Sequence, residues 1–179
     1  MDVFVWVDTE RENEKKQNWM SAVYLKAMLS RDASTKIGAI IVGPNEETRS
    51  SGYNGMPRGV DDDNEWRHER PQKYFYFEHA ERNAIYNAAR VGIPTDGCTM
   101  YTQGTPCADC ARAIIQAGIK KVVVHKRFDD FNSKKWSESA GYTQEMFNES
   151  GVELEVWDGD ILEIAGLHSG QEIGRSEDE

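Results

Sequence analysis

The chain has 179 residues, of which 39% are hydrophobic and 29% charged, and a formal net charge of −10 at pH 7. This size and composition predict one globular domain over residues 1–179 and exclude a disordered chain, and the lack of any run of about 18 apolar residues excludes a membrane span. The acidic charge argues against a long nucleic-acid partner, and the N-terminus lacks the pattern of a secretion signal, so we expect a cytoplasmic protein.

The first elements in chain order are predicted to be a helix and a β-hairpin. Residues 1–13 form an N-terminal extension in which residues 3–7 could be a short edge strand or a flap that packs on a neighbour. A helix is predicted over residues 14–30, with an apolar stripe formed by Met20, Val23, Tyr24, Ala27 and Met28. The apolar run at 37–43 predicts a strand buried on both faces, and turn residues at 44–47 lead to a returning strand at about 48–53.

Two loops of unusual composition follow the hairpin. Residues 52–59 contain three glycines and one proline. This composition favours an irregular loop in which backbone amides can point inward. Residues 60–77 form a long charged loop, and loops of this length inside compact domains are commonly functional.

Helices and strands alternate in the second half of the chain. We predict helices at 79–90, 107–117 and 137–149, and strands at 98–102, 121–125 and 152–157. Because helices join these three strands, the strands should be parallel, with right-handed crossovers. The predicted fold class is α/β, a three-layer α/β/α sandwich around a five-stranded mixed sheet. The acidic tail at 165–179 is expected to fray.

Four residues at the starts of two predicted helices form the most specific pattern in the sequence. His79 and Glu81 begin one helix, and Cys107 and Cys110 begin the next. A C-x-x-C pair on the first turn of a helix can direct both sulfurs to one point, where the helix N-terminus stabilises thiolates. One histidine and two cysteines provide three zinc ligands, and catalytic zinc keeps its fourth position for water, whose pKa it lowers toward about 7. Glu81 is left free to move protons.

A structural zinc site is the alternative for this cluster, but such a site normally has four protein ligands. His68, His125 and His168 offer no second ligand at a typical zinc spacing, and Cys98 is expected to be a small core residue. The combination of H-x-E with P-C-x-x-C is the signature of zinc nucleobase deaminases. The sequence therefore predicts a catalytic zinc.

With these motifs in place, the chain resembles the deoxycytidylate (dCMP) deaminases of the zinc-dependent cytidine deaminase superfamily. The resemblance runs from about Trp19 to His125. It is carried by Ser30-Arg31-Asp32, Gly38-Ala39, the segment Gly52-Tyr53-Asn54-Gly55-Met56-Pro57-Arg58-Gly59, His79-Ala80-Glu81, Asn83-Ala84-Ile85, Pro106-Cys107-Ala108-Asp109-Cys110 and residues 114–120. The zinc motif fits many deaminases, whereas G-Y-N-G-x-P points much more specifically to the deoxycytidylate branch.

The resemblance implies a cytidine deaminase-like fold and conversion of dCMP and water to dUMP and ammonia, which supplies dUMP for thymidylate synthesis. It implies His79, Cys107 and Cys110 as the ligands of one Zn²⁺ per subunit. Glu81 would be the proton shuttle that protonates N3 of cytosine and then the leaving amine. Members of this family are commonly homo-hexamers that dCTP activates and dTTP inhibits, with Mg²⁺ on the effector triphosphate.

The resemblance also implies residues for the substrate site. Asn54 would bind the sugar, and the candidates for the phosphate are Ser30, Arg31, Lys36 and Arg112. Thr105 stands where the family often has an aromatic residue before Pro-Cys. Phe128 stands where a tyrosine is typical; its ring can still stack on cytosine but has no hydroxyl to donate a hydrogen bond. Tyr74 and Tyr76 are the alternatives for this ring.

The effector site implied by the resemblance lies in and after the glycine-rich loop. Its candidate residues are Gly52, Tyr53, Gly55, Arg58 and Asp62. The alternative is that the glycines serve only backbone geometry and that the acidic run at 61–63 is solvated surface.

Two other functions share parts of this pattern. A deaminase acting on tRNA or single-stranded DNA would use the same zinc chemistry, but it would need a basic groove, and the sequence has no run rich in Lys and Arg. A non-catalytic nucleotide sensor on the same fold would have no need for a shuttling carboxylate, and Glu81 argues against it.

Overall fold

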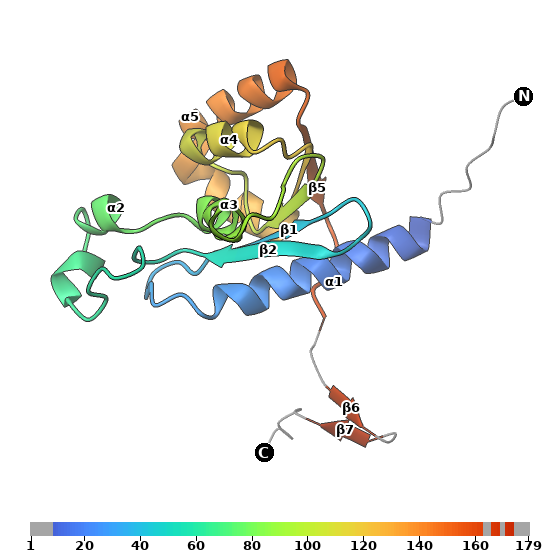
Figure 1. Ribbon diagram of the computed structural model, residues 1–179, viewed down its shortest axis with the longest axis horizontal. Helices are drawn as coiled ribbons and strands as arrows, with labels where there is room; N and C mark the ends of the chain where they lie inside the picture. Colours follow the sequence, from blue (N-terminus) through green and yellow to red (C-terminus); the bar gives the residue numbers. More distant parts are fainter. Residues whose placement is uncertain (1–8, 163–165, 169–170, 174–179) are drawn as a thin grey trace, which may run out of the picture.

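A five-stranded sheet between two helical layers forms the body of the molecule (Figure 1). The computed structural model describes residues 9–162, 166–168 and 171–173. The described elements are α1 (Thr9–Ala27), β1 (Gly38–Val42), β2 (Thr48–Tyr53), the 3₁₀ helix η1 (Glu65–His68), α2 (Lys73–Tyr76), α3 (Ala80–Val91), β3 (Thr99–Thr102), α4 (Ala108–Gln116), β4 (Lys121–His125), α5 (Lys126–Ser150), β5 (Glu153–Trp157), β6 (Gly166–His168) and β7 (Gln171–Ile173).

The sheet has the strand order β2-β1-β3-β4-β5. Strand β1 pairs antiparallel with both β2 and β3, and the pairs β3–β4 and β4–β5 are parallel. The predicted five-stranded mixed sheet and the predicted parallel pairing of the three later strands are therefore confirmed.

Strand β1 lies at the centre of the core because both of its faces are covered. Every residue of β1 is buried, as its continuous apolar sequence predicts. Ile40 and Val42 pack toward Met20 and Val23 of α1, which lies across one face of the sheet (Figure 1). Side chains on the other face of β1 pack under α3, α4 and α5, in a second cluster that includes Ala39, Ile41, Ala84, Ile114 and Phe147. This three-layer arrangement is the predicted one.

Helix boundaries differ from the prediction at two places. Helix α1 spans Thr9–Ala27 rather than 14–30, so residues 9–13 of the predicted extension are helical, while 1–8 lie outside the described residues. The chain leaves the helix after Ala27, and Met28 is 67% exposed instead of extending the apolar stripe. Helix α5 begins at Lys126, eleven residues before the predicted start at 137. Its first turns carry mostly charged residues and therefore lack the apolar periodicity that reveals a helix.

The long charged loop at 60–77 contains two short helical turns, η1 and α2, which extend past the end of the sheet (Figure 1). At the C-terminus, Gly166–His168 and Gln171–Ile173 pair as an antiparallel ladder, where the sequence predicts a frayed tail. The remainder of the predicted tail lies outside the described residues. Among the described helices, none combines the length and apolar character needed to cross a lipid bilayer.

Candidate active site

His79, Cys107 and Cys110 meet between the N-termini of α3 and α4. His79 is the N-cap residue of α3, Cys107 is the N-cap residue of α4, and Cys110 lies in the first turn of α4. The Nδ1 atom of His79 is 3.5 Å from the Sγ atom of each cysteine. All three donor atoms lie within 4.8 Å of one another. Two helix N-termini thus bring the predicted ligands to one point.

This donor set fits tetrahedral zinc. Zn–N bonds of about 2.1 Å and Zn–S bonds of about 2.3 Å place nitrogen and sulfur about 3.6 Å apart around a tetrahedral ion. The two observed separations of 3.5 Å agree with that geometry. Structural zinc sites are closed by four protein ligands, whereas three protein ligands leave a position for water, as in catalytic sites.

The charges of the cluster also favour a dication. Hydrogen bonding from Cys110 and from His79 lowers the pKa of Cys107 to about 4, against the opposing effect of burial. The hydrogen bond with Cys107 likewise raises the pKa of His79. The pKa of Cys110 is raised because it donates to Cys107 and is buried. The cysteine pair already carries one negative charge at neutral pH, and a bound dication would stabilise the second thiolate.

Glu81 lies beside these ligands on the first turn of α3. Its side chain is buried, with 6% of the residue exposed, and it lines the pocket next to His79. Burial raises the pKa of Glu81 above its usual range, against the opposing effect of His79. A carboxylate at the floor of the pocket, two residues from a ligand, can exchange protons with a molecule bound above the cluster.

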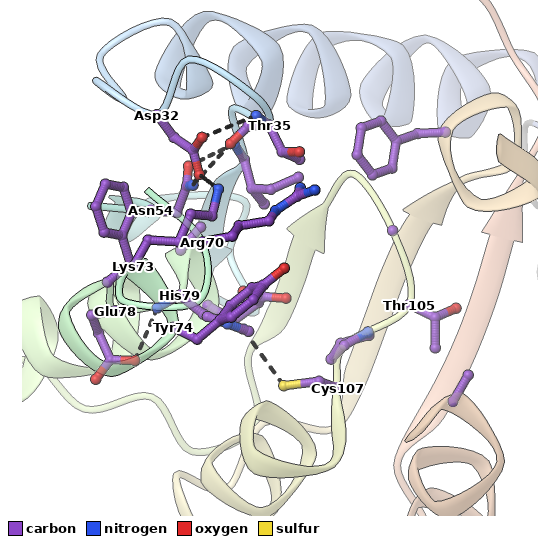
Figure 2. Close-up of a pocket in the computed structure, with 18 residues that line it drawn as sticks. Asp32, Thr35, Asn54, Arg70, Lys73, Tyr74, Glu78, His79, Thr105 and Cys107 are labelled. Atoms are coloured by element: carbon purple, nitrogen blue, oxygen red, sulfur yellow. Dashed lines mark hydrogen bonds and ion pairs between the residues drawn. The ribbon is translucent and has the colours of Figure 1, made fainter. Parts of the chain in front are cut away.

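The pocket is enclosed by segments that are distant in the sequence (Figure 2). Its walls come from the loop between α1 and β1, the segment from Arg70 to Glu81, the loop at 104–107 and the start of α5. The sequence-predicted residues that line it are Asn54, His79, Glu81, Thr105, Cys107 and Phe128. Tyr74, an alternative for the stacking ring, also lines the pocket.

A buried ion pair between Lys73 and Asp32 supports one wall of the pocket. Lys73, which is 7% exposed, places Nζ 2.6 Å from Oδ2 of Asp32 and 2.7 Å from Oγ of Ser34. The other carboxylate oxygen of Asp32 accepts hydrogen bonds from the backbone amides of Ser34 and Thr35, at 2.8 and 3.2 Å. Burial raises the pKa of Asp32, but Lys73 and Ser34 outweigh it and lower the pKa overall. The pair fixes the loop at 32–35 to α2.

Asn54 completes the same network at the end of β2. Its Oδ1 accepts a hydrogen bond from the Ile37 amide at 2.8 Å, and its Nδ2 donates to the Thr35 carbonyl at 2.9 Å and to Asp32 at 3.4 Å. Only one Oδ1 lone pair is left for a ligand. Asn54, which is 8% exposed, therefore shapes the wall in addition to facing the pocket.

Thr105 and Phe128 lie together at the opposite rim. The Thr105 amide donates a 2.7 Å hydrogen bond to Asp129, which ties the loop before Cys107 to the start of α5. The Phe128 ring packs against Gly104, where an added Cβ would come within 3.0 Å of Cδ1 of the ring. The ring therefore covers the loop that leads to the second zinc helix.

None of the predicted phosphate residues is among those that line the pocket, and Arg112 pairs instead with Asp109. Ser30 is buried, and its hydroxyl accepts a hydrogen bond from the Asp32 amide at 3.2 Å. Arg31 points to the acidic run, with its guanidinium 2.8 Å from Asp63. Lys36 is exposed. Ser30, Arg31 and Lys36 flank the wall at 32–37 rather than face the cavity.

The predicted effector residues also lie outside the pocket lining. Gly52 packs directly on α3, and the Tyr53 carbonyl accepts a 2.8 Å hydrogen bond from Asn83 of α3. Gly55 exchanges two backbone hydrogen bonds with Glu78, of 3.1 and 2.8 Å. The glycine-rich loop is thus attached to the helix that carries His79 and Glu81.

The other two effector candidates contact different elements. Arg58 donates a hydrogen bond to Asn87 of α3. Asp62 lies 3.5 Å from Arg31 and 3.3 Å from His68, so it connects the long charged loop to the loop after α1.

Sequence reasoning did not single out Asp32, Arg70, Lys73 or Glu78 as residues of the pocket wall. Three of them belong to a charged segment without apolar periodicity, where a buried lysine looks like any surface lysine. The sequence offered one indication that Arg70, Lys73 and Glu78 line the pocket, which is that they lie just before the His79 motif.

Comparisons with known proteins agree with this geometry. The family model described as the cytidine and deoxycytidylate deaminase zinc-binding region matches residues 13–126. An uncharacterized deaminase in the luxG 3′ region of Aliivibrio fischeri is 41% identical over 133 residues, which cover 74% of this chain and 86% of that protein. The deoxycytidylate deaminase of Homo sapiens is 38% identical over 146 residues, covering 78% of this chain and 77% of the human protein.

A similar fold is found in the crystal structure of dCMP deaminase from the cyanophage S-TIM5 in complex with dCMP and dUMP. The TM-score is 0.63 at 29% identity, with 80% of this chain and 97% of the phage chain covered. A three-layer α/β/α fold with one histidine, two cysteines and a buried glutamate at two helix N-termini is that of a zinc-dependent deaminase. More narrowly, the chain belongs to the cytidine and deoxycytidylate deaminase family.

Proposed function

We propose that this protein deaminates dCMP hydrolytically to dUMP and ammonia, and so supplies dUMP for thymidylate synthesis. The observation that carries the proposal is the buried Glu81 beside His79, Cys107 and Cys110 in one pocket. The relatives named deoxycytidylate deaminase support the choice of substrate.

The residues of the pocket have different roles in the proposed reaction. His79, Cys107 and Cys110 would hold Zn²⁺, which, when bound, lowers the pKa of a water molecule so that it can attack at neutral pH. Glu81 takes one proton from the attacking water and delivers it to N3 of cytosine. It then takes the second proton from the oxygen that has bonded to C4 and gives it to the amine, which leaves C4 as ammonia. Because Glu81 is buried, its proton passes to the substrate rather than to bulk water.

Other wall residues orient the nucleotide. The free Oδ1 lone pair of Asn54 accepts a hydrogen bond from a sugar hydroxyl, and Asp32 and Lys73 keep that amide in place. Phe128 offers a ring face on which cytosine can stack. Thr105, on the same rim, closes the side of the pocket next to Cys107.

Deamination of a nucleic acid is the rival activity. It is disfavoured by the net charge of −10, because a polynucleotide strand needs a basic groove to neutralise its phosphates. The test compares dUMP formation from dCMP with uracil formation in a cytosine-containing single-stranded oligonucleotide. Turnover of dCMP alone is expected, and turnover of the oligonucleotide alone would overturn the proposal.

We further propose that dCTP activates and dTTP inhibits the protein, as a homo-hexamer with Mg²⁺ on the bound triphosphate. The candidate effector residues remain Gly52, Tyr53, Gly55, Arg58 and Asp62. The attachment of this loop to α3 through Gly55–Glu78 and Tyr53–Asn83 supports the proposal, because a ligand that reorders the loop would also move the helix of His79.

Steady-state kinetics test this regulation. Velocity against dCMP concentration should be sigmoidal, dCTP with Mg²⁺ should make it hyperbolic, and dTTP should shift it to higher dCMP concentrations. A hyperbolic curve that neither nucleotide changes would contradict the proposed regulation by dCTP and dTTP. Light scattering on the same sample measures whether six chains associate.

A further inference from the structure

Arg70 is a cation of the pocket wall whose charge no described residue neutralises. It precedes α2, lines the pocket, and extends across it in Figure 2. Within the described part of the chain, no hydrogen bond or ion pair occupies its guanidinium. An arginine held at a pocket without a partner is a ready ligand for an anion.

The other charges of the wall are already neutralised. Lys73 forms an ion pair with Asp32 at 2.6 Å, and Glu78 forms one with Arg82 at 2.5 Å. Glu81 is buried at the floor and serves the zinc cluster. Apart from Glu81 and the zinc ligands, the described pocket lining is therefore left with one unpaired positive charge, although the whole chain has a net charge of −10.

The other cations near the pocket are less suited to this role. Arg31 pairs with Asp63 at 2.8 Å and does not line the pocket, and Lys36 is exposed and also absent from the lining. A guanidinium can donate two parallel hydrogen bonds to phosphate oxygens, whereas an ammonium acts as a point charge.

We propose that Arg70 binds the 5′-phosphate of the substrate and makes the enzyme select a nucleoside monophosphate over the unphosphorylated nucleoside. This inference rests on the proposed dCMP deamination and adds the residue that sets its specificity. Arg70 enters neither the zinc cluster nor the proton transfers, so its contribution should be confined to substrates and products that carry the phosphate.

Arg70→Gln tests the proposal, with dCMP and deoxycytidine as the two substrates. A hydrogen-bonded charge pair contributes enough that its loss should lower kcat/KM for dCMP about 10- to 100-fold, mainly through KM. The value for deoxycytidine should stay unchanged, and Arg70→Lys should restore part of the loss for dCMP. Arg90→Gln, which removes the same charge from an exposed position on α3, should leave both values unchanged.

Product inhibition gives a second readout, which reports binding of the phosphate in a molecule that is not itself converted. The affinity for dUMP should fall by a factor similar to that for dCMP, whereas inhibition by deoxyuridine should not change. An equal loss for dCMP and deoxycytidine, or no loss for either, would overturn the role of Arg70. Failure of the wild-type protein to deaminate dCMP would instead overturn the proposed function, so the two failures are distinguishable.

Discussion

Glu81→Gln is expected to keep zinc and the native fold but to form dUMP about 10²- to 10⁴-fold more slowly, the range typical of a lost general acid–base catalyst. Glutamine has nearly the shape of glutamate, so it fills the same buried space beside His79. It cannot accept the proton of water or return it to cytosine. The loss should therefore appear in kcat rather than in the amount of metal bound.

The measurement is the initial rate of dUMP formation together with zinc content per chain. Glu145→Gln is the matched control, because Glu145 is an exposed glutamate on α5 away from the pocket. It should behave as the wild type. Near wild-type turnover by Glu81→Gln would contradict the assigned proton shuttle, and loss of zinc in that variant would make Glu81 a ligand instead.

Gly52→Ala is expected to destabilise the fold by about 1–3 kcal/mol or more, the cost typical of overpacking a core. A Cβ at this position of β2 would lie 2.4 Å from the carbonyl oxygen of Ala80 and 2.4 Å from the amide nitrogen of Ala84. Both atoms belong to the backbone of α3, which cannot yield as a flexible side chain can. Relief requires the helix to move, and that helix carries His79 and Glu81.

Gly55→Ala is the control within the same loop. A Cβ there would meet nothing closer than the Tyr53 ring at 3.8 Å, an ordinary contact. Urea denaturation of the zinc-loaded proteins compares the two free energies of unfolding. We expect a clear loss for Gly52→Ala and little change for Gly55→Ala. Equal stability of the two variants would show that the close approach of β2 to α3 does not constrain this position.

This pair also separates two interpretations of the glycine-rich loop. The sequence alone leaves open whether Gly52 serves an effector site or backbone geometry. The distances to Ala80 and Ala84 already explain why a residue without a Cβ stands at position 52. They give no such explanation for Gly55, whose backbone is instead hydrogen-bonded to the backbone of Glu78, just before α3.

The zinc cluster was predictable because the residues of each of its motifs are close together in the sequence. The H-x-E and C-x-x-C motifs each lie within one helical turn, and a helix N-terminus fixes where their side chains point. The strands were equally predictable from the sequence. The apolar run of β1 and the alternation of helices with later strands can each be recognised without knowing which distant residues meet.

The residues that form the walls of the pocket were much harder to predict from the sequence. Lys73 and Asp32 are 41 residues apart, and nothing in either segment indicates that they form a buried ion pair. The same holds for Asn54, whose amide was expected to face the substrate and is in fact largely occupied by Ile37 and Thr35. Such contacts depend on how the loop after α1 meets α2 in space.

The most direct test of the account is a zinc titration followed by activity. The metal is removed with a chelator, and Zn²⁺ is returned in steps while dUMP formation from dCMP is measured. We expect no turnover without metal, and activity that rises in proportion to bound zinc and levels off at one ion per chain. Full dCMP turnover by the metal-free protein, or one bound zinc per chain without any dCMP turnover, would contradict the account.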